Sequence, residues 1–323
     1  MPNILSHNYV AQKALNILDS DALKETISKY PQEYSIGAQG PDFLFYHSAL
    51  PWQDKDLCSI SNNLGHMAHV EHINDFYQAC LDTIREVNDA SLQLAMISYV
   101  SGHLCHWALD SVAHPFVYYR TDGRTKETKY WHTRYESMLD SYMIDYYKAE
   151  NMPYLPVKNL LKHDEMCETA IRIIYLSVFK KVWDLDVKEE FIHDGLKDFK
   201  TVMSFSGKKT LLYEILRLYE ILTNDNWHFT RYFITGEKDE SRDILNLNHQ
   251  LWTHPADNSE VHHESYPELI EQAIERARKA LDLFANALGN QEEDRELLAF
   301  IGNRGYDSGK NAPIKIKYAD SIY

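Results

Sequence analysis

Histidine and aspartate recur at helical spacing within one apolar stretch of the sequence. His106, Asp110 and His114 stand at every fourth position, and His103 precedes them by one turn. At about 100° per residue, these side chains share one face of an α-helix. A carboxylate and several imidazoles on a buried face are costly unless they hydrogen-bond to one another or bind a metal ion.

A second pair of the same chemical types follows on a different predicted helix. His132 and Glu136 are at i and i+4, so they also share a helix face. Either pair alone is more often a surface pair or a hydrogen-bonded core histidine than a metal site. Two helices that both point such pairs inward can build a metal centre between them, and histidine with carboxylate suits zinc. The joint occurrence predicts a zinc site among the central helices.

The elements that must position these residues are predicted from apolar periodicity and capping residues. The apolar stretch from Leu92 to Ala113 predicts a central helix that ends at Pro115. Because His103, His106 and Asp110 interrupt this stretch, we expect the helix to be buried in the protein and not to span a membrane. Ser6 is the predicted N-cap residue of the first helix. A long loop is expected from Tyr30 to Asn62. Further helices are expected at 21–29, 65–87, through 131–142, and near 157–182, 188–204, 209–233 and 265–288.

The second half of the chain carries few clustered ligand types. Its apolar stripes are predicted to face the core, and the chain after Gly302 is predicted to be partly mobile. We expect an all-α fold, a multi-helix bundle with the metal site among its central helices and extra C-terminal helices. The predicted organisation is a helical domain at 1–155, a helical region packed on it at 156–302, and a tail at 303–323. The stripe expected to be core is Leu212, Ile215, Leu216, Tyr219 and Leu222.

Composition limits the function classes. The 323 residues are 44% hydrophobic and 25% charged, which is typical of a globular chain. The formal charge of −15 disfavours binding of extended nucleic acid. The cysteines form no CxxC pair and are expected to be reduced thiols. The first residues lack the basic and apolar regions of a secretory signal, so we expect a cytoplasmic protein without a transmembrane segment.

Over about residues 1–150, the sequence resembles the zinc-dependent phospholipase C family, which includes secreted bacterial phosphatidylcholine-cleaving enzymes and toxins. The resemblance rests on the order and helical context of ligand types along the whole stretch. The motifs are His7, the loop Gly37-Ala38-Gln39-Gly40-Pro41-Asp42, Gly65-xxx-His69, His106-xxx-Asp110, His114 and His132-xxx-Glu136.

The resemblance implies a set of metal ligands. One zinc would be held by Asp42, His69, His106 and Asp110, and a second by His114, His132 and Glu136. Asp110 would also reach a third metal beside His7. Asp42 is also the candidate catalytic residue, because it could accept a proton from water instead of binding metal.

Three features depart from the secreted members of that family, and one of them is that His114 lies four residues after Asp110, a little closer than in those enzymes. Their third metal is completed by the free amino terminus of the mature chain, whereas Pro2 here is much nearer to His7 in sequence. The lipid-binding β-sandwich of some toxins is also missing, because the C-terminal half is predicted to be helical. Two zinc ions are therefore expected, and a third site stays open.

The remaining histidines have simpler interpretations. His66 or His72 could replace His69 as ligand, but Gly65 favours His69. His103 is expected to hydrogen-bond behind the ligands, and His47 to pack within its loop. Beside Asp42, Phe43, Phe45 and Tyr46 would form either an apolar wall or loop core. The pairs His163-Asp164 and His193-Asp194 are expected on solvated helix surface, and loop packing or a substrate rim is expected for His249, His254, His262 and His263.

The function implied by the resemblance is hydrolysis of a phospholipid-type phosphodiester by metal-activated water. The substrate would be a phospholipid or another small phosphodiester, and peripheral contact with a membrane is compatible with it. Two alternatives stay open: a nuclease or nucleotidase of the same superfamily, and a non-catalytic helical binding protein that metal stabilises.

Overall fold

The computed structural model describes residues 4–50, 52–147, 157–204, 211–223, 229–234 and 238–323. The predicted all-α class is confirmed, with one small antiparallel sheet added in the described part of the chain. The α-helices are α1 (Ile4–Asn16), α2 (Asp21–Lys29), α3 (Pro31–Gly37), α4 (Lys55–Val70), α5 (Ile73–Glu86), α6 (Ala90–Thr121), α7 (Lys126–Tyr146), α8 (Val157–Leu160), α9 (Glu165–Trp183), α10 (Glu189–Ser204), α11 (Leu211–Thr223), α12 (Tyr266–Gly289) and α13 (Asp294–Ile301). The short elements are the 3₁₀ helices η1 (Asp42–Phe45), η3 (Phe229–Tyr232) and η4 (Gln291–Glu293), and the strands β1 (Trp252–His254) and β2 (Asp257–His262).

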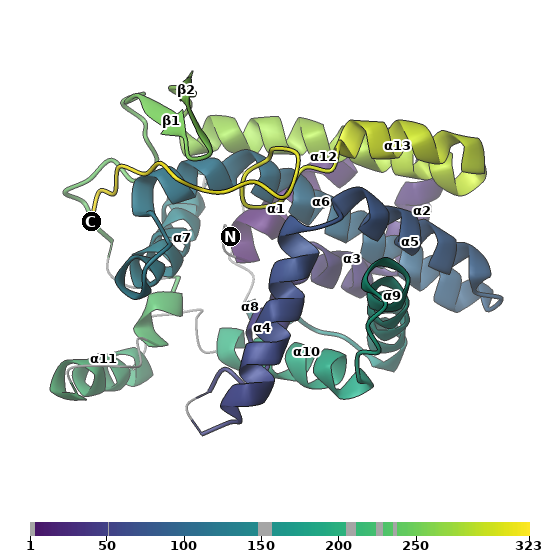
Figure 1. The fold of residues 1–323 in the computed structure, drawn as a ribbon, viewed down its shortest axis with the longest axis horizontal. Helices are drawn as coiled ribbons and strands as arrows, with labels where there is room; N and C mark the ends of the chain where they lie inside the picture. The colour runs from purple at the N-terminus through teal and green to yellow at the C-terminus, as the bar shows by residue number, and fades with distance from the viewer. Residues whose placement is uncertain (1–3, 51, 148–156, 205–210, 224–228, 235–237) are drawn as a thin grey trace.

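Helix α6 runs through the centre of the molecule. The Asp89 side chain caps it by accepting a hydrogen bond from the Leu92 N–H at 3.0 Å, and almost every residue from Ala95 to Val117 is buried. Helix α12 lies along α6, and α1, α2, α3, α7 and α9 pack around it (Figure 1). No described helix is both long enough and apolar enough to cross a bilayer.

Helices α3 and α6 meet at two glycines. A Cβ on Gly37 would lie 2.1 Å from the Tyr99 carbonyl oxygen, and one on Gly102 would lie 2.1 Å from the Tyr34 carbonyl oxygen. Only glycine permits this backbone approach. The contact holds α3, and the loop that follows it, close to the centre of α6.

The central helix does not end at Pro115, as the sequence analysis predicted; it continues to Thr121. Proline lacks an N–H and removes the helical bond to the carbonyl four residues earlier. That carbonyl belongs to Ser111 and faces Gly309, where a Cβ would lie 2.0 Å from its oxygen. Tertiary packing around a fully buried helix therefore overrides the local penalty.

The segment from Tyr30 to Asn62 was wrongly predicted to be one loop, because it contains α3, η1 and the start of α4. Pro31 occupies the first turn of α3, where no N–H is required. Asp54 caps α4 by accepting from the Asp56 N–H at 2.8 Å. The single helix predicted at 65–87 is also wrong, because it divides at His72, whose φ of 51° is left-handed.

Three predicted helices in the rest of the chain match closely: 21–29, 188–204 and 265–288 correspond to α2, α10 and α12. The helix predicted near 157–182 is two helices, because Asp164 caps α9 through the Cys167 N–H at 2.9 Å. The helix predicted near 209–233 ends at Thr223 in the described residues.

The apolar stripe of α11 was predicted to be core, and this is wrong. Ile215, Tyr219 and Leu222 are exposed, Leu216 is half-buried, and the side chain of Leu212 lies outside the described residues.

The chain after Gly302 packs against the molecule instead of extending from it. Tyr306 and Ser308 are buried, and the Tyr306 N–H donates to the His69 carbonyl at 2.9 Å. At the end of the chain, the Tyr323 ring stacks on Trp131 with centroids 4.1 Å apart. These contacts are tertiary, so neither periodicity nor apolar density reveals them. The domain boundary at 155 stays a prediction.

The start of α1 is held by a residue from α7 rather than by its own sequence. The Asp140 carboxylate accepts hydrogen bonds from the Leu5 N–H (2.8 Å), the Ser6 N–H (2.9 Å) and the Ser6 hydroxyl (2.6 Å). Ser6 is thus inside the first turn and is not the predicted N-cap. Asp140 instead binds the N–H groups that a helix start leaves without partners, and so it fixes the position of His7.

We expect Asp140→Ala to lower the free energy of unfolding by about 2 kcal/mol or more, because buried donors of α1 lose a charged acceptor. Asp75→Ala is the matched control, because Asp75 pairs with His72 on the surface and should change stability by less than about 0.5 kcal/mol. Denaturant unfolding of both variants measures this. Equal stability of the two variants would contradict the anchoring role.

Candidate metal centre

Polar side chains from five elements converge beside α6, and all of them are buried except His132, which is half-buried. His7 comes from α1, Asp42 from η1 and His69 from α4. The others are His106, Asp110 and His114 on α6, and His132 and Glu136 on α7. Each of the eight predicted ligands belongs to at least one cluster whose ligand atoms lie within 4.8 Å of one another, and each such cluster could hold a metal ion.

Two clusters share His106. In the first, the Asp42 Oδ1 lies 3.2 Å from the His69 Nε2 and 3.6 Å from the His106 Nε2. In the second, the Asp110 carboxylate lies between two imidazoles, with Oδ2 3.1 Å from the His106 Nε2 and Oδ1 3.3 Å from the His7 Nε2. The His7 and His106 rings stack with centroids 4.1 Å apart.

The third cluster joins α6 to α7. The Glu136 Oε1 lies 3.1 Å from the His132 Nε2 and 3.5 Å from the His114 Nε2. Asp110 lies within 4.0 Å of the His114 ring. The same carboxylate therefore lies near imidazoles of both ends of the centre.

Four of the imidazoles share one orientation. Each turns Nδ1 toward a protein oxygen, and Nε2 is thereby left facing a carboxylate of the cluster. Metal-binding histidines commonly have this arrangement, because the second hydrogen bond fixes the tautomer and the ring. The oxygens are the carbonyls of Gly65 for His69 (2.6 Å), Ala38 for His106 (3.2 Å) and Tyr306 for His114 (3.2 Å), and the Thr121 hydroxyl for His132 (2.9 Å).

The donor set fits metal because buried polar atoms in it lack hydrogen bonds. Among the described residues, no hydrogen-bond partner exists for either ring nitrogen of His7, the Nε2 of His106 and His114, or either oxygen of Asp110. Buried polar groups are normally hydrogen-bonded. Imidazole nitrogens and carboxylate oxygens that all face one space are the donor types that zinc takes.

The electrostatics of the centre keep His114, His132 and Asp110 in the forms that bind metal, whereas at His106 the neighbouring carboxylates favour the protonated ring. Burial lowers the pKa of His114 and His132 well below the ordinary value, so these rings are neutral. Burial by itself would raise the pKa of Asp110, but His106, His114 and His7 hold it well below the ordinary carboxyl value. Burial also opposes protonation of His106, but Asp110 and Asp42 raise its pKa.

The loop before η1 reaches the centre because of Gly40. Its φ is +54°, and a Cβ there would lie 2.2 Å from the His106 ring, so a side chain would displace the imidazole. Of the aromatic residues after Asp42, Phe45 lies beside His69 with ring centroids 5.0 Å apart, whereas Phe43 is buried against Tyr175. The predicted apolar wall and the predicted loop core thus each describe part of this segment.

The other histidines near the centre do not join these clusters. His66 and His72 are exposed, and His72 pairs with Asp75 at 2.9 Å, so the geometry favours His69 among the three. His103 is buried, with Nδ1 3.0 Å from the Tyr77 hydroxyl and Nε2 3.3 Å from the Tyr175 hydroxyl. His47 packs edge-on against Phe191.

The histidines of the second half also lie outside the clusters formed by the described residues. His193 pairs with Glu168 at 2.6 Å on the surface, and Asp164 caps α9. His254 is buried in the β-hairpin, where its Nε2 donates to the Ser308 carbonyl at 2.8 Å. His262 stacks on Trp252, with ring centroids 4.2 Å apart. Loop packing therefore describes His254 and His262, whereas His249 and His263 are exposed.

Residues 304–308 also help to build the centre, although no sequence pattern predicted their contribution. Tyr306 supplies the carbonyl that orients His114, and its hydroxyl lies 2.9 Å from that of Tyr77. The Trp107 Nε1 donates to the Arg304 carbonyl at 2.9 Å. Burial raises the pKa of Asp307 to about 6. The sequence signal that could have identified this segment is its density of glycines around Tyr306.

A comparison with protein families agrees with this geometry. The family model described as zinc dependent phospholipase C matches residues 6–192, a range that contains all eight candidate ligands and more than half of the chain. No curated protein and no solved structure matches the chain significantly. The family resemblance predicted from the motifs is confirmed by this match.

We expect Asp110→Asn to weaken zinc binding about tenfold or more, because the charged oxygens between the imidazoles are lost. His163→Ala, on a helix connection away from the clusters, should keep the zinc content of the unmodified protein. Elemental analysis of both purified variants measures this. Equal losses in the two variants would refute the role of Asp110.

Zinc binding should also survive mild acidification. Protons compete with metal for imidazole nitrogens. Because burial lowers the pKa of His114 and His132, their protonation requires a pH below the ordinary histidine value of about 6.5. Zinc content after dialysis across pH 4.5–7.5, at about half-unit steps, should fall in two stages, because Asp110 and Asp42 raise the pKa of His106 whereas burial lowers that of His114 and His132. The zinc held by His114 and His132 should be lost below about pH 6.5, and loss of all zinc above that value would contradict the expected protonation states.

Proposed function

The chain belongs to the zinc-dependent phospholipase C family, and on that premise we propose that it is a phosphoric diester hydrolase that acts on a phospholipid-type substrate. The observation that carries the proposal is the buried convergence of His7, Asp42, His69, three α6 ligand types and the α7 pair around one space. A purely structural core has no need of so many polar atoms without hydrogen bonds.

We assign the donors as follows. Asp42, His69, His106 and Asp110 would hold one zinc ion, and His114, His132 and Glu136 a second. His7 with Asp110 offers a third position, because the Asp110 Oδ1 lies 3.3 Å from the His7 Nε2 while its Oδ2 lies 3.1 Å from the His106 Nε2. When bound, zinc supplies Lewis-acid chemistry, because it polarises phosphoryl oxygens and makes water more acidic.

The residues of the chain supply positioning and proton transfer. Asp42 lies on a short 3₁₀ helix at the edge of the centre, and its carboxylate is within 3.2 Å of His69. From there it either binds metal or accepts the proton of the attacking water. Asp110 attracts the imidazoles of His7, His106 and His114 through its charge, and the Nδ1 contacts of His106 and His114 keep those two rings from rotating.

Aromatic side chains at the centre favour a substrate with an apolar part. The Phe45 ring lies beside His69, and the Tyr118 ring lies 4.6 Å from that of His132 between centroids. Burial raises the pKa of Tyr118, so its hydroxyl stays protonated and can donate a hydrogen bond. Aromatic rings beside the ligands offer an apolar surface to the hydrophobic part of an amphipathic substrate.

Substrate class is tested with zinc-loaded protein and two soluble substrates, a chromogenic phosphocholine ester and a nucleotide diester. We expect hydrolysis of the phosphocholine ester, because the charge of −15 disfavours nucleic-acid substrates. Hydrolysis of the nucleotide diester alone would support a nuclease instead. Bound zinc without turnover of either substrate would favour a metal-stabilised binding protein. The cytoplasmic location stays a prediction.

Asp42→Asn separates the two roles of Asp42. If Asp42 accepts the proton of the attacking water, its replacement should leave the zinc content nearly unchanged and lower kcat about 100-fold or more. If Asp42 instead binds zinc, its replacement should lower the zinc content and kcat together. Zinc content and kcat are measured on the same preparation, with His163→Ala as the control that should change neither. Full activity of Asp42→Asn would exclude both roles.

A further inference from the structure

A cavity of about 440 Å³ lies among α8, α9 and α10, and we call it the lysine cavity. Helix α10 packs against both α8 and α9 (Figure 1). A cavity of this volume has room for a small organic ligand. The described residues that line it are all polar, and three of them are lysines: Lys158, His163, Glu168, His193, Lys197, Lys200, Thr201 and Ser204.

The lysines of the cavity stand close to one another in the fold. Lys197 and Lys200 are one turn apart on the same face of α10. Lys158 reaches the same cavity from α8. Like charges one turn apart repel each other and destabilise a helix. The arrangement is therefore unfavourable unless an opposite charge compensates it.

No acidic side chain of the described residues compensates these lysines. The ammonium groups of Lys158, Lys197 and Lys200 form no ion pair and no hydrogen bond with them. Glu168 is the one acid among the described residues that line the cavity, and it already pairs with His193 at 2.6 Å. The chain has 48 acidic residues against 33 lysines and arginines, so the unpaired lysines do not result from a shortage of acids.

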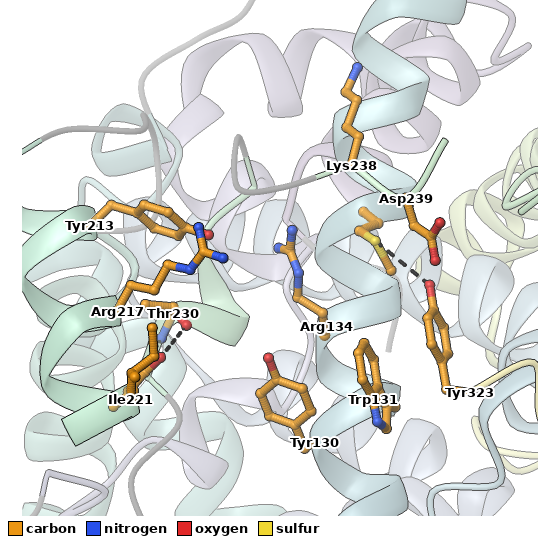
Figure 2. Close-up of a pocket in the computed structure, with 12 residues that line it drawn as sticks. Tyr130, Trp131, Arg134, Tyr213, Arg217, Ile221, Thr230, Lys238, Asp239 and Tyr323 are labelled. Carbon is orange, nitrogen blue, oxygen red and sulfur yellow. Dashed lines mark hydrogen bonds between the residues drawn. The ribbon is translucent and has the colours of Figure 1, made fainter. Parts of the chain in front are cut away.

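A larger cavity between α7 and α11, of about 490 Å³, differs in this respect (Figure 2). Two of its cations have partners, because Arg134 donates to the Phe233 carbonyl at 2.9 Å and Lys238 pairs with Asp145. The acidic Asp239 also lines it. Unpaired positive charge is thus a property of the lysine cavity and is not shared by this larger one.

The lysine cavity is separate from the metal centre. The opposite face of α10 packs on η1, where a Cβ on Gly195 would lie 2.9 Å from the Phe43 ring. On that face Asp198 accepts a hydrogen bond from the Ser48 N–H at 2.9 Å. None of the eight candidate metal ligands is among the described residues that line the cavity. A molecule bound there would therefore contact the lysines and not the metal-binding side chains.

The charge of the cavity selects the class of ligand. Three ammonium groups around one space favour an anion with more than one charge, because a single carboxylate would leave two of them uncompensated. A phosphate group carries nearly two charges at neutral pH, and lysine is a common partner for it. The formal charge of −15 disfavours extended nucleic acid. A small phosphorylated molecule is therefore the class that fits.

We propose that the lysine cavity binds the phosphate group of a small phosphorylated molecule through Lys158, Lys197 and Lys200. A free phosphorylated compound and the headgroup of an anionic lipid present the same group to these ammonium ions, and the test distinguishes the two sources. The proposal does not depend on the function proposed above, because no candidate metal ligand takes part in it.

The test is protection of lysines from reductive methylation by inorganic phosphate, measured residue by residue by mass spectrometry on the zinc-loaded full chain. Lys158 and Lys197 are exposed and Lys200 is half-buried, so the reagent reaches all three. At saturating phosphate their methylation rates should fall about tenfold or more, because a charge-assisted hydrogen bond occupies each ammonium group. Lys24 and Lys29, which pair with acids on α2, should keep their rates.

Two double variants localise the site. K197Q/K200Q removes two charges of the lysine cavity, and K24Q/K29Q is the matched control on α2. The phosphate concentration that gives half protection of Lys158 should rise about tenfold or more in K197Q/K200Q, because each lost charged hydrogen bond weakens binding. It should stay unchanged in K24Q/K29Q. Circular dichroism melting of both variants checks that each is folded.

Vesicles of phosphatidylcholine that contain phosphatidic acid form the second arm of the test. Protection of the three lysines by free phosphate supports a soluble ligand, and protection by these vesicles alone would keep the phosphate site and assign it to a lipid headgroup. Absence of protection by both probes, or equal half protection of Lys158 in the two double variants, would overturn the proposal. Phosphate bound at the zinc centre would not protect these lysines, so the result is independent of any hydrolase activity.

Discussion

The charge of Asp110 is the constraint on which the rest of the structure depends. An ionised carboxylate at the middle of a buried helix is strongly unfavourable by itself. Here His106, His114 and His7 surround it, and they hold its pKa well below the ordinary value. Because these imidazoles come from α6 and α1, compensation of one charge ties the first helix to the central one. Asp140 completes the connection by fixing the start of α1.

The centre is built by the segment that matches the family and is completed by residues beyond it. The ligands lie within residues 6–192, but the carbonyl that orients His114 belongs to Tyr306. That loop is held in turn by hydrogen bonds from Trp107 and His254. Residues after the matched segment therefore determine how rigidly the ligands are held, as the groups behind metal ligands generally do.

Two places in the molecule reverse the usual rule of polar outside and apolar inside. Around Asp110, polar atoms are buried without hydrogen bonds among the described residues, and bound metal would satisfy them. On α11, Leu211, Ile215, Leu218 and Leu222 are exposed, while Tyr213 on the other side of the helix is buried. Bound metal outside the chain would explain the buried polar atoms, which agrees with the zinc-dependent family to which the chain belongs.

The sequence by itself determined the helical class and which residues converge. Period and ligand type are local properties, so His106, Asp110 and His114 could be placed on one face from spacing alone. Tertiary structure decided what local pattern cannot encode: that α6 continues through Pro115, that α11 turns its stripe outward, and that Tyr306 enters the centre. Each of these depends on contacts between residues far apart in the chain, whose energies outweigh local preference.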